Sequence, residues 1–208
     1  MTRIKICGIT NLEDALFAVQ CGADALGFIG VPESPRYVGR FDGWDEIPSL
    51  VPPPVTCICV CRTVTDALQG FETLQTYSLP NSARPPRKRL ILTARISGPS
   101  SLEDLAVAIK QPGVQPPAAL LLDAYSPGAL GGTGERFDWA LAKQAQQRFG
   151  LPVILAGGLT PENVAEAIIK IQPWMVDVAS GVEAEPGRKD PAKVNAFCEA
   201  VRNASREV

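Results

Sequence analysis

The chain has 208 residues, 46% of them hydrophobic, and a net charge of −2. That length and apolar content can bury one substantial core, and we expect a single domain over residues 1–208. The acidic balance argues against nucleic acid as a partner. No apolar run is long enough to span a membrane, and the first residues lack the apolar stretch of a signal peptide, so we expect a cytoplasmic protein.

Histidine is absent from the chain. Its absence excludes Ser-His and Cys-His nucleophile pairs, His-ligated zinc and imidazole acid–base chemistry. Any proton transfer must therefore use Asp, Glu, Cys, Lys or Tyr.

Short apolar runs alternate with helical patterns along the chain. In the first unit, Thr10 and Glu13 have the spacing of a helix capping box, and Gly22 marks the end of that helix. Asp190 followed by Pro191 indicates another helix start. Repeated strand–helix units predict the α/β class, with a parallel sheet and helices outside it. Seven strands are clear, and they begin near Arg3, Asp24, Val55, Arg89, Ala118, Pro152 and Trp174.

The stretch Thr63–Lys88 is the weakest part of this pattern. It should hold one helix and an eighth strand, but it carries three prolines and a basic cluster. Either the strand is very short, near Gln75–Leu79, or the barrel is irregular. We predict a (β/α)8 barrel, the TIM-barrel fold, with an irregular or abbreviated strand 4/helix 4 region.

Three of the six cysteines, Cys57, Cys59 and Cys61, alternate in an apolar run and would share one face of a strand. The outer two would lie about 13 Å apart, too far to bind one zinc ion whose Zn–S bonds are about 2.3 Å. We therefore expect buried small hydrophobic side chains and no metal site, and we disfavour a redox or metal protein built on this strand.

Sites in parallel barrels lie at the carboxyl ends of the strands. In the strand RIKIC, Lys5 and Cys7 should point into the barrel, and a nearby cation would lower the pKa of the Cys7 thiol and make it a useful base. Asp123 ends the apolar run AALLLDA, where burial would raise its pKa and suit it to act as a general acid. The alternatives are a structural cysteine and a capping or ion-paired aspartate.

Glycine-rich loops follow the later strands, and phosphate in such barrels often binds to backbone N–H groups after strands 7 and 8. A second glycine-rich segment has the composition of a mobile lid. Arg36, in the loop after strand 2, could hold a carboxylate through two hydrogen bonds, or it could be a surface residue. The candidates are Gly157, Gly158, Ser180 and Gly181 for phosphate, and Gly131, Gly132, Thr133 and Gly134 for the lid.

Taken together, these stretches resemble the phosphoribosylanthranilate isomerase family of tryptophan biosynthesis, and they cover well over half of the chain in the family's order. The matching stretches are KICGIT (5–10), GADALGF (22–28), SPRYV (34–38), LLLDA (120–124), PGALGGTG (127–134), FDW (137–139), PVILAGGLTPENVAEAI (152–168), VDVASGV (176–182) and PGRKDP (186–191).

The resemblance implies an intramolecular oxidoreductase without cofactor or metal, which performs an Amadori rearrangement of N-(5′-phosphoribosyl)anthranilate. Asp123 would be the general acid, Cys7 the general base and Arg36 the ligand of the substrate carboxylate. Lys5 and Asp177 would line the ribose site, and the backbone around the phosphate candidates would hold the phosphate.

One family feature is missing. The family usually ends strand 4 with Gln-Leu-His-Gly, and nothing in this chain matches it. An alternative is therefore a catalytically degenerate barrel that binds a phosphorylated ligand without converting it. A related sugar-phosphate isomerase is a further alternative, because the phosphate site is generic. The sequence leaves open whether the protein is a monomer or a homodimer.

Overall fold

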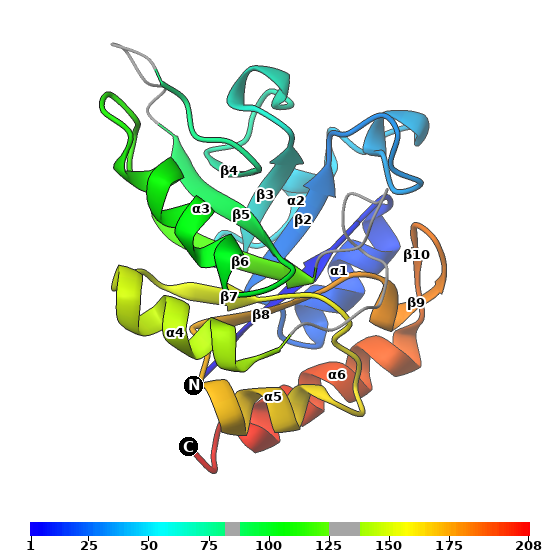
Figure 1. Ribbon diagram of the computed structural model, residues 1–208. Coiled ribbons are helices and arrows are strands. Elements are labelled where there is room, and N and C mark those ends of the chain that lie inside the picture. The colour runs from blue at the N-terminus through cyan, green and yellow to red at the C-terminus, as the bar shows by residue number, and fades with distance from the viewer. Residues whose placement is uncertain (82–87, 125–137) are drawn as a thin grey trace.

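The computed structural model describes residues 1–81, 88–124 and 138–208. Eight parallel strands close into a barrel in chain order, and β1 pairs with β8 (Figure 1). The predicted (β/α)8 fold is therefore confirmed. The strands are β1 (Arg3–Cys7), β2 (Ala25–Ile29), β3 (Thr56–Cys61), β4 (Thr73–Thr76), β5 (Arg89–Ile96), β6 (Ala119–Ala124), β7 (Val153–Leu155) and β8 (Met175–Val178).

Helices cover the outside of the barrel (Figure 1). Asp190 caps the last helix through hydrogen bonds from the N–H groups of Ala192 and Lys193, as predicted. The first helix differs from the prediction, because Asn11 and not Thr10 is its N-cap. The helices are α1 (Leu12–Gln20), α2 (Ile47–Leu50), α3 (Ser100–Lys110), α4 (Ala140–Phe149), α5 (Val164–Ile171) and α6 (Pro191–Ala204). None of the helices in the described ranges is long and apolar enough to cross a membrane.

The side of the barrel around β4 is irregular, as the sequence indicated. The uncertain eighth strand is β4, four residues long and starting at Thr73. The helix expected in this stretch is reduced, within its described part, to one 3₁₀ turn, η2 (Val64–Asp66). Phe71 lies in the short connection between β3 and β4 and packs against Phe28, with ring centroids 5.5 Å apart. A large side chain thus covers the barrel where a crossover helix would normally do so.

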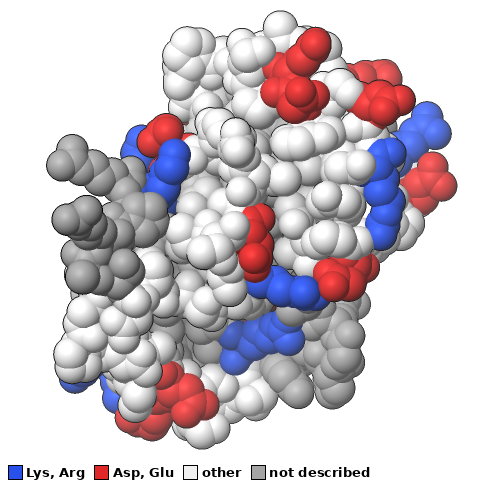
Figure 2. Space-filling view, turned by 90° about the horizontal axis from the view of Figure 1, so that it is seen from above, with Lys and Arg blue, Asp and Glu red and all other residues white. Residues whose placement is uncertain are grey.

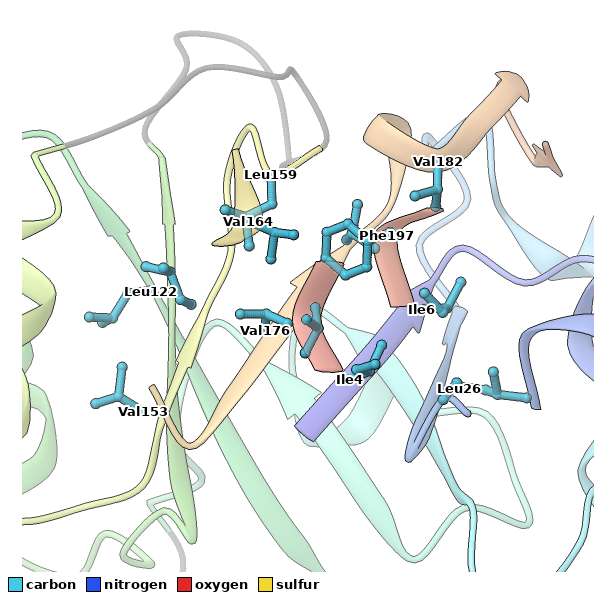
Figure 3. Close-up of a cluster of buried hydrophobic side chains, with 14 of the residues drawn as sticks. Ile4, Ile6, Leu26, Leu122, Val153, Leu159, Val164, Val176, Val182 and Phe197 are labelled. Carbon is cyan, nitrogen blue, oxygen red and sulfur yellow. The ribbon is translucent and has the colours of Figure 1, made fainter. Parts of the chain in front are cut away.

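The core has two layers. The inner layer fills the barrel with alternate strand residues, among them Ile58, Leu121 and Ile154. The outer layer lies between strands and helices, and Figure 3 shows Phe197 of α6 among the side chains of the neighbouring strands. Cys59 and Cys61 are buried in this outer layer, and Cys57 packs against it partly buried. The prediction of buried small hydrophobic side chains is therefore confirmed for Cys59 and Cys61 and holds only in part for Cys57.

A small hairpin follows β8 and lies beside the barrel mouth. The 3₁₀ turn η3 (Ser180–Val182) leads into β9 (Glu183–Glu185), which pairs antiparallel with β10 (Arg188–Lys189). The backbone N–H of Lys189 also donates to the side chain of Asp14 in α1, at 2.8 Å. The hairpin is therefore attached to the first βα unit.

Candidate active site

Cys7, Asp123 and Asp177 lie at or near the carboxyl ends of β1, β6 and β8. These ends form the face towards which β2 and β3 run in Figure 1, and Figure 2 views the molecule from that side. Acidic and basic side chains lie next to one another near the middle of this face (Figure 2). The same end of the barrel therefore carries both kinds of charge that the proposed chemistry needs.

Lys5 and Asp177 form an ion pair across the β1–β8 junction. Lys5 Nζ lies 2.8 Å from Asp177 Oδ1, and the Lys5 side chain is fully buried. The two residues are register partners on the adjacent strands. Burial disfavours the ammonium, but the charges of Asp177 and Cys7 outweigh it and raise the pKa of Lys5. Lys5 is therefore a permanent cation inside the barrel.

Cys7 lies beside Lys5, with Gly27 of β2 facing both. A Cβ at Gly27 would come within 2.7 Å of Cys7 Sγ and 3.0 Å of Lys5 Nζ. The thiol is buried, and burial raises its pKa although Lys5 and Lys189 act in the opposite direction. The prediction that a cation acts on Cys7 is confirmed, but the prediction of a net lowering is wrong, because desolvation of the thiolate is the larger effect.

Asp123 has the raised pKa that the sequence predicted. Burial is the main cause and the charge of Asp177 the next, and together they bring the pKa of Asp123 to about 6. Gly157 approaches this carboxyl closely, since a Cβ there would lie 3.0 Å from Asp123 Oδ1. A carboxylic acid with this pKa holds a proton in part of the population near neutral pH, as a general acid requires.

The four predicted phosphate residues come together in one pocket. Gly157, Gly158, Ser180 and Gly181 line a small cavity of about 40 Å³, with Asp123 and Asp177 at its edge. Gly157 and Gly158 have positive φ values of 84° and 63°, which favour glycine. The two loops touch closely, because a Cβ at Gly181 would lie 2.0 Å from the carbonyl oxygen of Leu159.

Arg36 is buried, so the surface alternative does not apply. Its stem crosses Gly8, where a Cβ would lie 2.6 Å from Arg36 Cδ, and this places the guanidinium near the end of β1. The guanidinium donates two-pronged hydrogen bonds to Glu183, with Nε to Oε1 at 2.8 Å and Nη2 to Oε2 at 2.7 Å. Arg36 therefore has an internal carboxylate partner that the sequence analysis did not find.

Two more residues of the mouth were missed. Tyr77 directly follows β4, and Arg95 of β5 lies over its ring, 5.2 Å from the centroid. Burial and the charge of Asp123 raise the pKa of Tyr77 to about 12. Nε of Arg95 is buried without a hydrogen-bond partner among the described residues. The prolines around β4 hid this strand end, so its inward side chains could not be placed. The predicted lid, Gly131, Gly132, Thr133 and Gly134, lies outside the described residues.

Comparisons with known proteins agree with one another. A family model described as "PRAI: N-(5'phosphoribosyl)anthranilate (PRA) isomerase" matches residues 82–200. The N-(5'-phosphoribosyl)anthranilate isomerase of Citrifermentans bemidjiense is 45% identical over 205 residues, which cover 93% of this chain and 94% of the relative. The chain belongs to the N-(5'-phosphoribosyl)anthranilate isomerase family.

Solved isomerases of the family have the same fold. The Thermotoga maritima phosphoribosyl anthranilate isomerase superposes with a TM-score of 0.79 at 34% identity, covering 98% of this chain and 100% of that one. A second isomerase structure, in complex with reduced 1-(o-carboxyphenylamino)-1-deoxyribulose 5-phosphate, gives a TM-score of 0.76 at 32% identity, with 98% and 100% covered. As a member of this family, the chain is an isomerase.

The end of β4 is where the isomerase family usually has Gln-Leu-His-Gly. β4 ends at Thr76, and the residues around its carboxyl end are Gln75-Thr76-Tyr77-Ser78. Gln75 is buried. Apart from one glutamine, these residues do not match the signature, and the chain contains no histidine. At this strand end, Tyr77 lies under the guanidinium of Arg95.

Proposed function

We propose that this isomerase converts N-(5′-phosphoribosyl)anthranilate to 1-(2-carboxyphenylamino)-1-deoxyribulose 5-phosphate in tryptophan biosynthesis, with Asp123 as general acid and Cys7 as general base. One observation carries the proposal. A buried thiol and a carboxyl group with a pKa of about 6 lie at the same end of the barrel, and the carboxyl group lines a pocket together with Gly157, Gly158, Ser180 and Gly181. A phosphorylated small molecule is the ligand that such a mouth suits.

The reaction needs one proton delivered and one removed. Asp123 protonates the ribose ring oxygen while its bond to C1′ breaks, and the anilino nitrogen lone pair forms the C1′=N iminium. The Cys7 thiolate then removes the proton from C2′, and the C2′–H electrons form the C1′=C2′ bond and neutralise the iminium. The resulting enolamine gains a proton at C1′ and loses its C2′ hydroxyl proton to give the ketose.

The remaining side chains bind and orient the substrate. The phosphate lies at the backbone of Gly157, Gly158, Ser180 and Gly181, in the pocket next to Asp123. Arg36 binds the anthranilate carboxylate. Lys5 and Asp177 line the ribose site, and the buried Lys5 ammonium stabilises negative charge on Cys7.

The pKa values predict that only a minority of molecules hold the reactive combination of a protonated Asp123 and a Cys7 thiolate. The pKa of Asp123 is about 6 and that of Cys7 is raised by burial, so near neutral pH most molecules hold the carboxylate and the thiol. The reaction needs the reverse, with the proton on Asp123 and a thiolate at Cys7. These two forms have the same total charge, so their ratio does not change with pH between the two pKa values.

Complementation of a strain that lacks this isomerase tests the proposal. The wild-type gene should restore growth without tryptophan, and the purified protein should turn over the substrate. Cys7→Ala and Asp123→Asn should lower kcat strongly and keep affinity for the reduced product analogue. Absence of turnover by folded wild-type protein, or unchanged turnover in Cys7→Ala, would overturn the assignment.

The second candidate is a degenerate barrel that binds the phosphorylated ligand without converting it. The observation that favours it is the absence of histidine from the chain, whose β4 is followed by Tyr77 within electrostatic reach of Asp123. Calorimetric titration with the reduced product analogue separates the two functions, because binding without turnover supports this candidate. The single-domain organisation, the cytoplasmic location, the lid and the independence from cofactors stay predictions.

A further inference from the structure

We propose that Glu183 is a positioning residue that selects an aromatic carboxylate substrate, because it fixes the guanidinium of Arg36 with one edge open to the ligand. The inference rests on the proposed function, in which Arg36 binds the anthranilate carboxylate. Glu183 and its second partner, Lys189, both come from the β9–β10 hairpin.

The contact between Arg36 and Glu183 uses one side of the guanidinium. Glu183 accepts hydrogen bonds from Nε at 2.8 and 3.1 Å and from Nη2 at 2.7 Å. The adjacent Nη1–Nη2 edge shares Nη2 through its second hydrogen, and Nη1 has no hydrogen-bond partner among the described residues. This edge has the geometry for a second two-pronged carboxylate contact. Glu183 therefore orients Arg36 and does not occupy the edge that would bind substrate.

Packing restricts Arg36 further. Its stem lies against Gly8, whose φ of 78° and lack of a Cβ allow the close approach. Arg36 and Glu183 are only 8% and 7% exposed. A buried guanidinium that is held on one edge and along its stem has lost most of its freedom before a ligand arrives. This preorganisation reduces the entropic cost of binding.

Lys189 keeps Glu183 ionised and in place. Its Nζ donates to Glu183 Oε1 at 2.9 Å, to the carbonyl oxygen of Cys7 at 2.6 Å and to that of Ala179 at 3.3 Å. Although burial opposes ionisation, the hydrogen bonds from Arg36 and the charge of Lys189 hold the pKa of Glu183 below its usual range.

The charge of the cluster also favours an anion. Arg36 and Lys189 are cations and Glu183 is an anion, so the cluster holds one more cation than anions, although burial lowers the pKa of Lys189. Burying a charge without a partner is unfavourable, and a ligand carboxylate on the open edge would balance it. The same lysine bonds to the carbonyl of Cys7, so the hairpin places the carboxylate site next to the thiol.

A double-mutant cycle with two ligands tests the inference. The ligands are the reduced product, reduced 1-(o-carboxyphenylamino)-1-deoxyribulose 5-phosphate, and the same compound with an unsubstituted phenyl ring. Their Kd values are measured by calorimetry for wild type, Glu183→Gln, Arg36→Met and the double variant. Glu185→Gln is the matched control, because Glu185 lies on the same strand β9 with an exposed side chain.

We expect wild type to prefer the carboxylated ligand about 10- to 100-fold, the range for hydrogen bonds between charged groups. Glu183→Gln should lose most of this preference, because the loss of a fixed Arg36 orientation should outweigh the added positive charge, and it should bind the unsubstituted ligand as wild type does. The double variant should have the same two Kd values as Arg36→Met alone, because Glu183 acts only through Arg36. Glu185→Gln should leave both Kd values unchanged.

Two results would overturn the inference and leave the proposed function standing. In one, wild type prefers the carboxylated ligand and Glu183→Gln keeps that preference. In the other, Glu183→Gln weakens both ligands equally, which is the result of a purely structural role. If wild type binds neither ligand, the proposed function fails together with the inference. If Glu183→Gln does not fold, the charge-balanced variant Glu183→Gln/Lys189→Met replaces it, with the same expected loss of preference.

Discussion

Asp123→Asn should stabilise the protein at neutral pH while it abolishes activity. Burial and the charge of Asp177 raise the pKa of Asp123 from 3.8 to about 6. The folded state therefore holds its proton more tightly than the unfolded chain does, and stability falls as the pH rises from about 4 through about 6. At about 1.4 kcal/mol per pH unit, the ionised carboxylate lowers the free energy of unfolding by about 3 kcal/mol above pH 6.

Urea unfolding of wild type and Asp123→Asn at pH 4 and pH 7.5, followed by circular dichroism, measures this effect. The free energy of unfolding of the variant relative to wild type should increase by about 2 kcal/mol between the two pH values, because the unfolded carboxyl is already partly ionised at pH 4. Comparing the same two proteins at both pH values removes any packing effect of asparagine, since that effect does not titrate. An increase below about 1 kcal/mol, or a decrease, would refute the reasoning that burial of a charge sets the pKa of Asp123.

Three further predictions follow from the same geometry. The pH profile of kcat/KM should have a plateau from about pH 6 up to the raised pKa of Cys7, and kcat/KM should fall below and above it. A maximum confined to pH 7 would contradict the assignment of Cys7 and Asp123. Gly27→Ala should lower kcat at least about tenfold, because its Cβ would displace the thiol, whereas the open site Gly98→Ala should keep wild-type kcat in the same steady-state assay. Gly181→Ala should lower the thermal midpoint and raise KM, measured by calorimetry and kinetics, because its Cβ would push the two phosphate loops apart, and unchanged values would contradict that contact.

Much of the site follows from strand periodicity. Lys5 and Cys7 share the inward face of β1 because strands alternate every two residues, and Asp123 ends a buried strand. Each of these inferences needs only neighbouring residues. The direction of the pKa shift at Asp123 was predictable for the same reason, because a long apolar run before a carboxyl group already indicates its burial.

The remainder depends on contacts between distant parts of the chain. Glu183 and Arg36 are separated by 147 residues, and Lys189 and Cys7 by 182. The stretches KICGIT, SPRYV and PGRKDP hold Cys7, Arg36 and Lys189, but no local pattern shows which side chains meet. The net pKa of Cys7 was missed because burial and nearby cations compete, and their balance is set only by the folded structure. Tyr77 was missed because four-residue β4 lies in a proline-rich stretch.

If Lys5 and Asp177 line the ribose site as proposed, their ion pair makes the assembly of the barrel a condition for catalysis. Its two side chains come from the first and last strands of the barrel, 172 residues apart, so the contact has a very long sequence separation. Contacts of this kind form late or slowly during folding, because a large loop must close first. Partly folded forms that lack the pairing of these two strands should therefore be inert, and the recovery of activity should report the last topological step of refolding.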